Sequence, residues 1–203
     1  MANLLEGKRG LVIGVANERS IAWGIANVLA KHGAELAITY QTKAFEKRVR
    51  PLAESIGSKL VLPADVQNEE SLTYLFNKLE EIWGTLDFLV HAVAYSNKEE
   101  LVGSFINTSR SNFLNSLDIS CYSLIDLSRR AVPLMKEGGS IVTLTYMGSQ
   151  RITPNYNVAP GSEVVVLAGG PQKMKWTYTP SWAKTPINII NARIETLNEK
   201  PSF

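Results

Sequence analysis

The sequence predicts an α/β protein built on a doubly wound, Rossmann-like parallel sheet. Short apolar runs of strand length alternate with longer segments of helical period, a pattern that favours parallel strands joined by helices. Five such runs and four intervening helical segments fit within the first 145 residues. We therefore expect one sheet with helices on both of its faces.

Local signals define the first three elements. Residues 11–14 form an apolar run that ends in glycine and predicts the first strand. Ser20 can cap a helix that continues to His32 and stops at Gly33, the residue type that most often follows a helix. Residues 34–40 predict the second strand.

Six further elements complete the predicted sheet. Residues 69–83 predict a helix because Leu72, Leu75, Leu79 and Ile82 share one face. The other expected elements are the helices 43–56 and 111–135 and the strands 59–62, 86–91 and 140–145. Ligands of such sheets bind outside the carboxyl ends of the strands, so we expect the chemistry just after each strand.

Composition excludes several classes of function. The chain has 203 residues, 45% of them hydrophobic, and its 21 basic and 19 acidic residues leave a net charge of +2, which favours neither nucleic acid nor a membrane surface. Cys121 is the only cysteine and His32 and His91 the only histidines, so we expect no disulfide framework and no metal site. No apolar run approaches the ~20 residues of a membrane span, and we expect a cytoplasmic protein.

The turn after the first strand can hold a diphosphate. Gly14 permits a tight turn, and small Ala16 permits close approach of the backbone. Ser20 and Ile21 place a hydroxyl and backbone amides at a helix N-terminus, where an anion is favoured. The glycine pattern is not G-x-G-x-x-G, and a purely structural turn is an equally good reading of this segment alone.

Five short motifs together resemble one family. They are Gly14-x5-Ser20-Ile21-Ala22-x-Gly24, Tyr40-Gln41, Asp65-Val66, His91-Ala92-Val93-Ala94 and Tyr146-x9-Tyr156-Asn157-Val158. Over residues 5–158 the chain resembles the bacterial NADH-dependent enoyl-acyl-carrier-protein reductases, a divergent branch of the short-chain dehydrogenase/reductases. The resemblance implies a homotetrameric enzyme of fatty-acid synthesis that reduces trans-2-enoyl thioesters on acyl carrier protein.

The resemblance also implies a set of cofactor-binding residues. Asp65 would accept a hydrogen bond from the adenine amino group while Val66 packs on the ring, and the less favoured alternative for Asp65 is a helix cap. Gln41 stands where many such folds place an acid for the ribose, and nearby Lys43 could meet the 2′-phosphate of NADPH, but NADH is the expected cofactor. The implied set is Gly14, Ala16, Ser20, Ile21, Gln41, Asp65, Val66 and Val93, with Ser96 contacting substrate.

Two tyrosines carry the chemistry that the resemblance implies. Hydride transfer to the β-carbon of the enoyl thioester leaves an enolate, and Tyr156 would stabilise its oxygen and supply the proton. Tyr146 would shape the pocket around the acyl chain. The alternative for each tyrosine is a core or rim aromatic, and His91 is better read as a satisfied structural histidine than as a catalyst.

The resemblance ends at residue 158, which divides the chain into a dinucleotide-binding domain, 1–158, and a divergent, proline-rich tail, 159–203. Glu163 stands where the family has a lysine that holds the ribose and makes the tyrosine more acidic. Reversing that charge at about 6 Å costs roughly 3 kcal/mol, and lost hydrogen bonds add to this, so a thousandfold loss of rate or more is expected. Pro160 also opposes the helix expected there.

The tail is interpreted as the product of a shifted reading frame, with a truncated paralogue as the alternative. We expect the last strands of the family fold to be missing and the tail to be poorly ordered, with a short strand at 164–167 and a short helix at 187–197. The fifth strand would then be an exposed edge. Two functions remain open: an enoyl reductase with impaired activity, or a non-catalytic nucleotide-binding domain or fragment.

Overall fold

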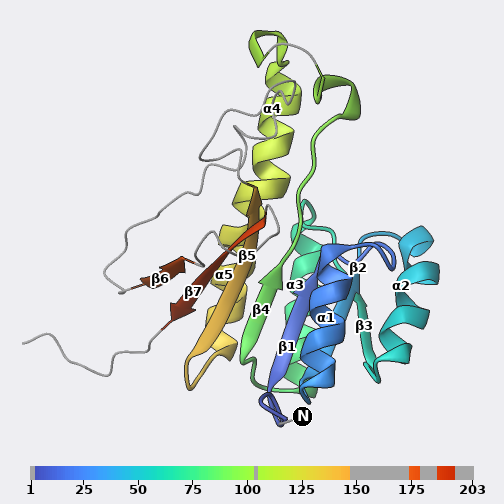
Figure 1. The fold of residues 1–203 in the computed structure, drawn as a ribbon, viewed down its shortest axis with the longest axis vertical. Helices are drawn as coiled ribbons and strands as arrows, with labels where there is room; N and C mark the ends of the chain where they lie inside the picture. Colours follow the sequence, from blue (N-terminus) through green and yellow to red (C-terminus); the bar gives the residue numbers. More distant parts are fainter. Residues whose placement is uncertain (1–2, 103–104, 147–173, 179–186, 195–203) are drawn as a thin grey trace, which may run out of the picture.

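The computed structural model describes residues 3–102, 105–146, 174–178 and 187–194, and its centre is a twisted sheet (Figure 1). Within these residues the sheet has seven strands in the order β3-β2-β1-β4-β5-β7-β6. The strands are β1 (Arg9–Ile13), β2 (Glu35–Tyr40), β3 (Leu60–Pro63), β4 (Phe88–His91), β5 (Gly139–Tyr146), β6 (Met174–Tyr178) and β7 (Ile187–Ile194). Strands β1 to β5 are all parallel, which confirms the predicted doubly wound sheet. The strand order reverses between β1 and β4, the place where such folds bind ligands.

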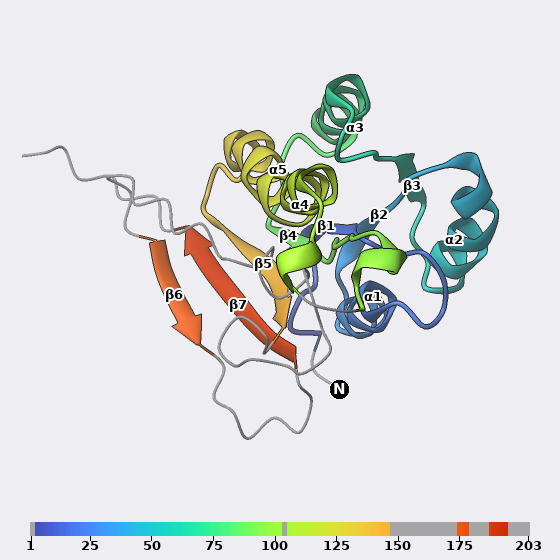
Figure 2. The same ribbon diagram turned by 90° about the horizontal axis from the view of Figure 1, so that it is seen from above.

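Helices cover both faces of the parallel strands. They are α1 (Ile21–Lys31), α2 (Lys43–Ser55), α3 (Glu69–Ile82), α4 (Arg110–Leu117) and α5 (Ser123–Ala131). Figure 2 shows α1 and α2 on one face of the sheet and α3, α4 and α5 on the other. Short 3-10 turns lie at Lys98–Glu100, Phe105–Asn107 and Val132–Leu134.

Each face of the sheet buries its own apolar cluster. Successive side chains of β1 alternate between them: Leu11 and Ile13 pack with the residues of α3 and α5, and Val12 packs with those of α1 and α2. Strands buried on both sides read as continuous apolar runs, which is why these segments were recognisable from the sequence.

The predicted helix 111–135 is not continuous. It is α4, then a π-helical turn at Asp118–Tyr122, then α5, and it ends in the 3-10 turn Val132–Leu134. A π turn adds one residue to a helix without changing which residue types are apolar, so the apolar pattern did not predict it.

Two expectations for the tail are wrong. Ile187–Ile194 is a strand rather than a helix, and it pairs antiparallel with all of β5, so β5 is not an exposed edge. The segment Ile187-Asn188-Ile189-Ile190 is rich in β-branched residues, which favour a strand, and pairing satisfies the backbone groups along β5. Strand β6 then pairs antiparallel with β7. The strand expected at 164–167 lies outside the described residues.

Candidate functional site

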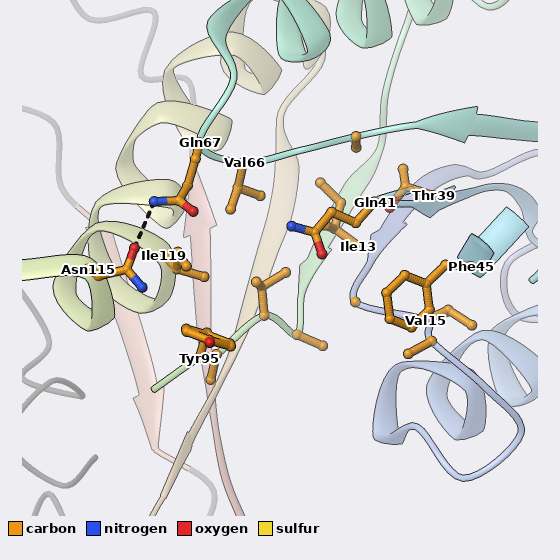
Figure 3. Close-up of a pocket in the computed structure, with 16 residues that line it drawn as sticks. Ile13, Val15, Thr39, Gln41, Phe45, Val66, Gln67, Tyr95, Asn115 and Ile119 are labelled. Atoms are coloured by element: carbon orange, nitrogen blue, oxygen red, sulfur yellow. Dashed lines mark hydrogen bonds between the residues drawn. The ribbon is translucent and has the colours of Figure 1, made fainter. Parts of the chain in front are cut away.

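A cavity of about 490 Å³ opens at the carboxyl ends of β1 to β4 (Figure 3). Its walls come from the segments that follow these four strands and from α4 and the π turn. The lining residues are Ile13, Gly14, Val15, Ala16, Thr39, Gln41, Phe45, Ala64, Val66, Gln67, Ala92, Val93, Ala94, Tyr95, Asn115 and Ile119. A cavity of this size and mixed apolar and polar lining is typical of a small-molecule or cofactor site.

The turn after β1 forms one wall, and at Gly14 this turn has no room for a side chain. Gly14 has φ +113°, and a Cβ added there would lie 2.1 Å from the carbonyl oxygen of Ala92. Backbone of this kind can approach a ligand closely, as a dinucleotide requires. Of the predicted residues in this turn, Gly14 and Ala16 line the cavity, whereas Ser20 and Ile21 do not.

Ser20 folds this turn. Its Oγ accepts hydrogen bonds from the backbone N–H of Ala16 at 3.0 Å and of Asn17 at 3.1 Å, and its side chain does not cap α1. The first N–H groups of α1, those of Ile21 and Ala22, precede the intrahelical hydrogen bonds and stay available to an anion.

The ends of β2 and β3 form the far side of the cavity. Gln41 follows β2 and lines the cavity with Phe45 of α2. Val66 follows β3 and also lines it, but Asp65 does not. The Oδ1 atom of Asp65 accepts a hydrogen bond from the backbone N–H of Gln67 at 3.1 Å, so this carboxylate stabilises the turn after β3.

The segment after β4 carries Val93, Ala94 and Tyr95 along the cavity, but Ser96 faces elsewhere. The Oγ of Ser96 accepts a hydrogen bond from Nδ2 of the buried Asn112 at 3.1 Å. Asn112 also donates to Glu100, whose carboxylate accepts from both the hydroxyl and the backbone N–H of Ser109. The hydroxyl of Ser109, and then its backbone N–H, lower the pKa of Glu100. This network fixes the loop after β4 to the start of α4.

His91 is buried at the end of β4, and both of its ring nitrogens have partners. The hydroxyl of Ser123 donates its one hydrogen to the carbonyl of Ile119 at 2.6 Å, so it must accept from Nε2 of His91, 2.8 Å away. Nδ1 then accepts from the hydroxyl of Thr143 at 2.9 Å. Burial lowers the pKa of His91 to about 4, which keeps the ring neutral at pH 7. The histidine is structural, as the sequence indicated, and it joins β4 and β5 to the π turn.

The two tyrosines assigned to the chemistry and the residue that replaces the family lysine are not described by the structure, except for the backbone of Tyr146. Tyr146 is the last residue of β5, where its backbone pairs with Ile187, and its side chain lies outside the described part of the structure. Tyr156 and Glu163 also lie outside the described residues. Among the residues that are described, no cluster of three or more metal-ligating side chains occurs, and no helix is long and apolar enough to cross a membrane.

The sequence alone indicated none of three polar or aromatic members of the lining, Phe45, Gln67 and Asn115. Tyr95, which also lines the cavity, could be read from the sequence as either a pocket wall or a surface aromatic. Gln67 could have been predicted from the sequence, because it lies within four residues of the end of β3, where ligands of such sheets bind. Asn115 and Ile119 are four residues apart and reach the cavity from the helix side, which no strand-end rule indicates.

Comparisons with known proteins agree on one family. A family model described as enoyl-(acyl carrier protein) reductase matches residues 14–166. The NADH-dependent enoyl-[acyl-carrier-protein] reductase FabI of Rickettsia bellii is 56% identical over 155 residues, which cover 76% of this chain and 59% of that protein. FabI of Aquifex aeolicus is 53% identical over 156 residues, covering 76% and 58%. The chain thus spans about three fifths of the length of these relatives.

Solved structures show the same likeness. The reductase of Anaplasma phagocytophilum in complex with NAD matches with a TM-score of 0.78 and 52% identity, over 80% of this chain and 62% of that one. The Bacillus cereus reductase with NADP+ and an indole naphthyridinone matches with a TM-score of 0.77 and 45% identity, over 80% and 64%.

Proposed function

Because the chain belongs to the enoyl-(acyl carrier protein) reductase family, we propose that it binds NADH in the cavity and reduces trans-2-enoyl thioesters carried by acyl carrier protein. The observation that carries this proposal is the cavity at the strand-order reversal, which contains Gly14, Ala16, Gln41, Val66 and Val93 of the expected cofactor-binding set. The homotetramer and the cytoplasmic location expected of the family belong to the same proposal.

The described residues fit an extended dinucleotide. Gly14 lets the turn after β1 pass closely by the segment after β4, because a Cβ there would collide with the carbonyl oxygen of Ala92, and the N-terminus of α1 that follows this turn favours the diphosphate. Gln41 lies at the end of β2, where the adenosine ribose is expected, and its uncharged amide suits a ribose diol better than a 2′-phosphate. Val66, Val93 and Ile119 supply apolar surface for a flat base.

When bound, NADH supplies the hydride for the β-carbon of the substrate. The protein must then stabilise the negative charge that develops on the thioester oxygen, and we assign that role and the proton to Tyr156. Tyr146 and Ser96 are assigned to the substrate pocket. Asn112 holds the hydroxyl of Ser96 toward α4, so contact with substrate would require this hydrogen bond to open or the Ser96 backbone to make the contact.

The sign of the charge at residue 163 favours a second candidate function. Glu163 replaces the lysine that the family uses beside its tyrosine, and a carboxylate there opposes the acidic phenol that catalysis needs. A chain that binds NADH without turning it over is therefore the alternative.

The test is NADH oxidation with a crotonyl thioester, followed by absorbance, together with NADH binding followed by fluorescence. We expect binding and slow turnover that disappears in Tyr156→Phe and rises in Glu163→Lys. Binding with no turnover in any of the three proteins would favour the nucleotide-binding alternative. Absence of NADH binding by the folded protein would contradict both.

A further inference from the structure

The exposed side chain of Gln67 bridges the turn after β3 to α4 and the π turn at one edge of the cavity. The amide nitrogen of Gln67, Nε2, donates to Oδ1 of Asn115 at 3.0 Å and to Oδ2 of Asp118 at 2.9 Å. The backbone N–H of Gln67 is itself held by Asp65. Gln67 and Asn115 both line the cavity, and Figure 3 shows the hydrogen bond between their side chains.

Asp118 fixes which way both amides point. An ionised carboxylate only accepts hydrogen bonds, so the NH2 group of Gln67 must face Asp118. Its two hydrogens are then both used, one on Asp118 and one on Asn115, and Asn115 must present its oxygen to Gln67. Within the described part of the chain, the carbonyl oxygen of Gln67 and the NH2 group of Asn115 are left without a partner. In Figure 3 both lie on the side of the bridge that faces Val66 and Ile119.

An acceptor beside a donor matches the edge of adenine. Adenine presents its 6-amino group, a donor, next to the ring acceptor N7, and a paired amide oxygen and amide nitrogen bind this edge with two hydrogen bonds. The apolar side chains of Val66 and Ile119 line the cavity beside the two amides and can hold the flat ring.

We propose that Gln67 and Asn115, oriented by Asp118, recognise the adenine base of the dinucleotide. This rests on the proposed function, because it assumes a nicotinamide dinucleotide in this cavity. Gln67 and Asn115 contact the base in this proposal, whereas Asp118 is a positioning residue.

The experiment compares the dissociation constants of NADH and of its reduced hypoxanthine analogue, measured by nicotinamide fluorescence on the full chain. The analogue replaces the 6-amino donor by a carbonyl acceptor and leaves the rest of the molecule unchanged. The wild-type chain should prefer NADH by about tenfold or more, since one paired contact discriminates between bases by roughly five- to hundredfold. The proteins to compare are the wild type, Gln67→Leu, Asn115→Leu, Asp118→Asn and, as a control, Asn107→Leu at an exposed amide outside the cavity.

We expect the preference for NADH to fall by about fivefold in Gln67→Leu and Asn115→Leu, to fall less in Asp118→Asn, and to stay unchanged in Asn107→Leu. If the bridge were purely structural, its loss would weaken the binding of NADH and of the analogue equally. An unchanged ratio of the two dissociation constants in Gln67→Leu, Asn115→Leu and Asp118→Asn would therefore overturn the inference and leave the proposed function intact. If the folded wild-type chain binds neither ligand, the proposed cofactor is wrong and the inference falls with it. Gln67 and Asp118 are exposed, so at least these variants should fold.

Discussion

The two faces of the parallel sheet are both covered by helices, but they bury different chemistry. Under α1 and α2 lies an apolar cluster around Val12, Ile38 and Val90, and the buried hydroxyl of Ser58 beside it donates to the carbonyl of Leu36. Under α3 and α5 the cluster is apolar around Leu75 and Leu89, but beside it lies the buried hydrogen-bonded set His91, Thr143 and Ser123.

This polar set lies where the strands end and the cavity begins. Through Ser123 it reaches the carbonyl of Ile119, a residue that lines the cavity. The face under α1 and α2 contributes apolar side chains such as Val15 and Phe45 to the cavity, whereas the other face also fixes a wall of the site through buried hydrogen bonds. Buried hydrogen-bonded networks specify one arrangement more strictly than apolar contacts do, because an unpaired member costs free energy.

The largest expected effect compares a glycine on each face. In Gly10→Ala the new Cβ would lie 1.8 Å from Cε2 of Phe88, a ring packed under α1 and α2, and we expect a loss of about 3 kcal/mol in the free energy of unfolding. In Gly139→Ala it would lie 2.6 Å from Sδ of Met135 on the other face. The methionine side chain is flexible and can move, while the carbonyl oxygen of Asp87 at 3.0 Å requires only a small shift, so we expect a loss of about 1 kcal/mol. Urea unfolding measures both, and an equal loss would contradict the difference in rigidity.

The second prediction concerns the pH dependence of the free energy of unfolding, and it depends on a residue of the α3 and α5 face, His91. The pKa of His91 is lowered from 6.5 to about 4, so between these values the unfolded chain binds a proton that the native chain does not. Stability should therefore fall as pH decreases from about 6.5 to about 4, by about 3 kcal/mol in total. Unfolding curves across this range test it, and His91→Gln should remove this part of the pH dependence. An identical pH profile in the variant would show that His91 is not the group responsible.

A smaller effect is expected from Ser123→Ala. The variant leaves the Nε2–H of His91 without its acceptor and the carbonyl of Ile119 without its hydroxyl donor, which we expect to cost about 2 kcal/mol. Ser128→Ala, at a less buried position of the same helix, is the matched control and should change stability by less than about 0.5 kcal/mol. Similar losses in the two variants would mean that the hydrogen-bond chain adds little.

The smallest effect is expected on the outer side of α1. Val28 is 55% exposed, so Val28→Ala removes little buried surface and gains helix propensity. We expect the free energy of unfolding to change by less than about 0.5 kcal/mol in either direction. A loss above 1 kcal/mol, measured by urea unfolding, would show that this face of α1 is covered in solution.

The parallel part of the fold could be predicted because it depends on patterns that are local in sequence. The apolar run around Leu11 and the shared face of Leu72, Leu75 and Leu79 each specify one element with no knowledge of its neighbours. The π turn and β7 could not be predicted in this way. The π turn depends on a single added residue within a helix. Strand β7 depends on the edge of β5, a strand that lies far from β7 in the chain.

The candidate site was predictable on its strand side and not on its helix side. Gly14, Gln41, Val66 and Val93 follow strands, and all of them line the cavity. Ser96 is held to α4 instead, because the buried amide of Asn112 needs hydrogen-bond partners, a requirement that only the packed structure shows.

The π turn at Asp118–Tyr122 also determines how the side chains of α5 are rotated around the helix axis relative to those of α4. Successive residues of an α-helix are about 100° apart around its axis, so one additional residue rotates everything that follows by that angle. Asn115 can therefore point to the cavity while Leu127 and Ala131, further along, point into the sheet. The number of residues between the two segments, more than the identity of any one of them, keeps both directions correct. Deleting one residue from this turn would force a choice between a closed core and a complete cavity wall.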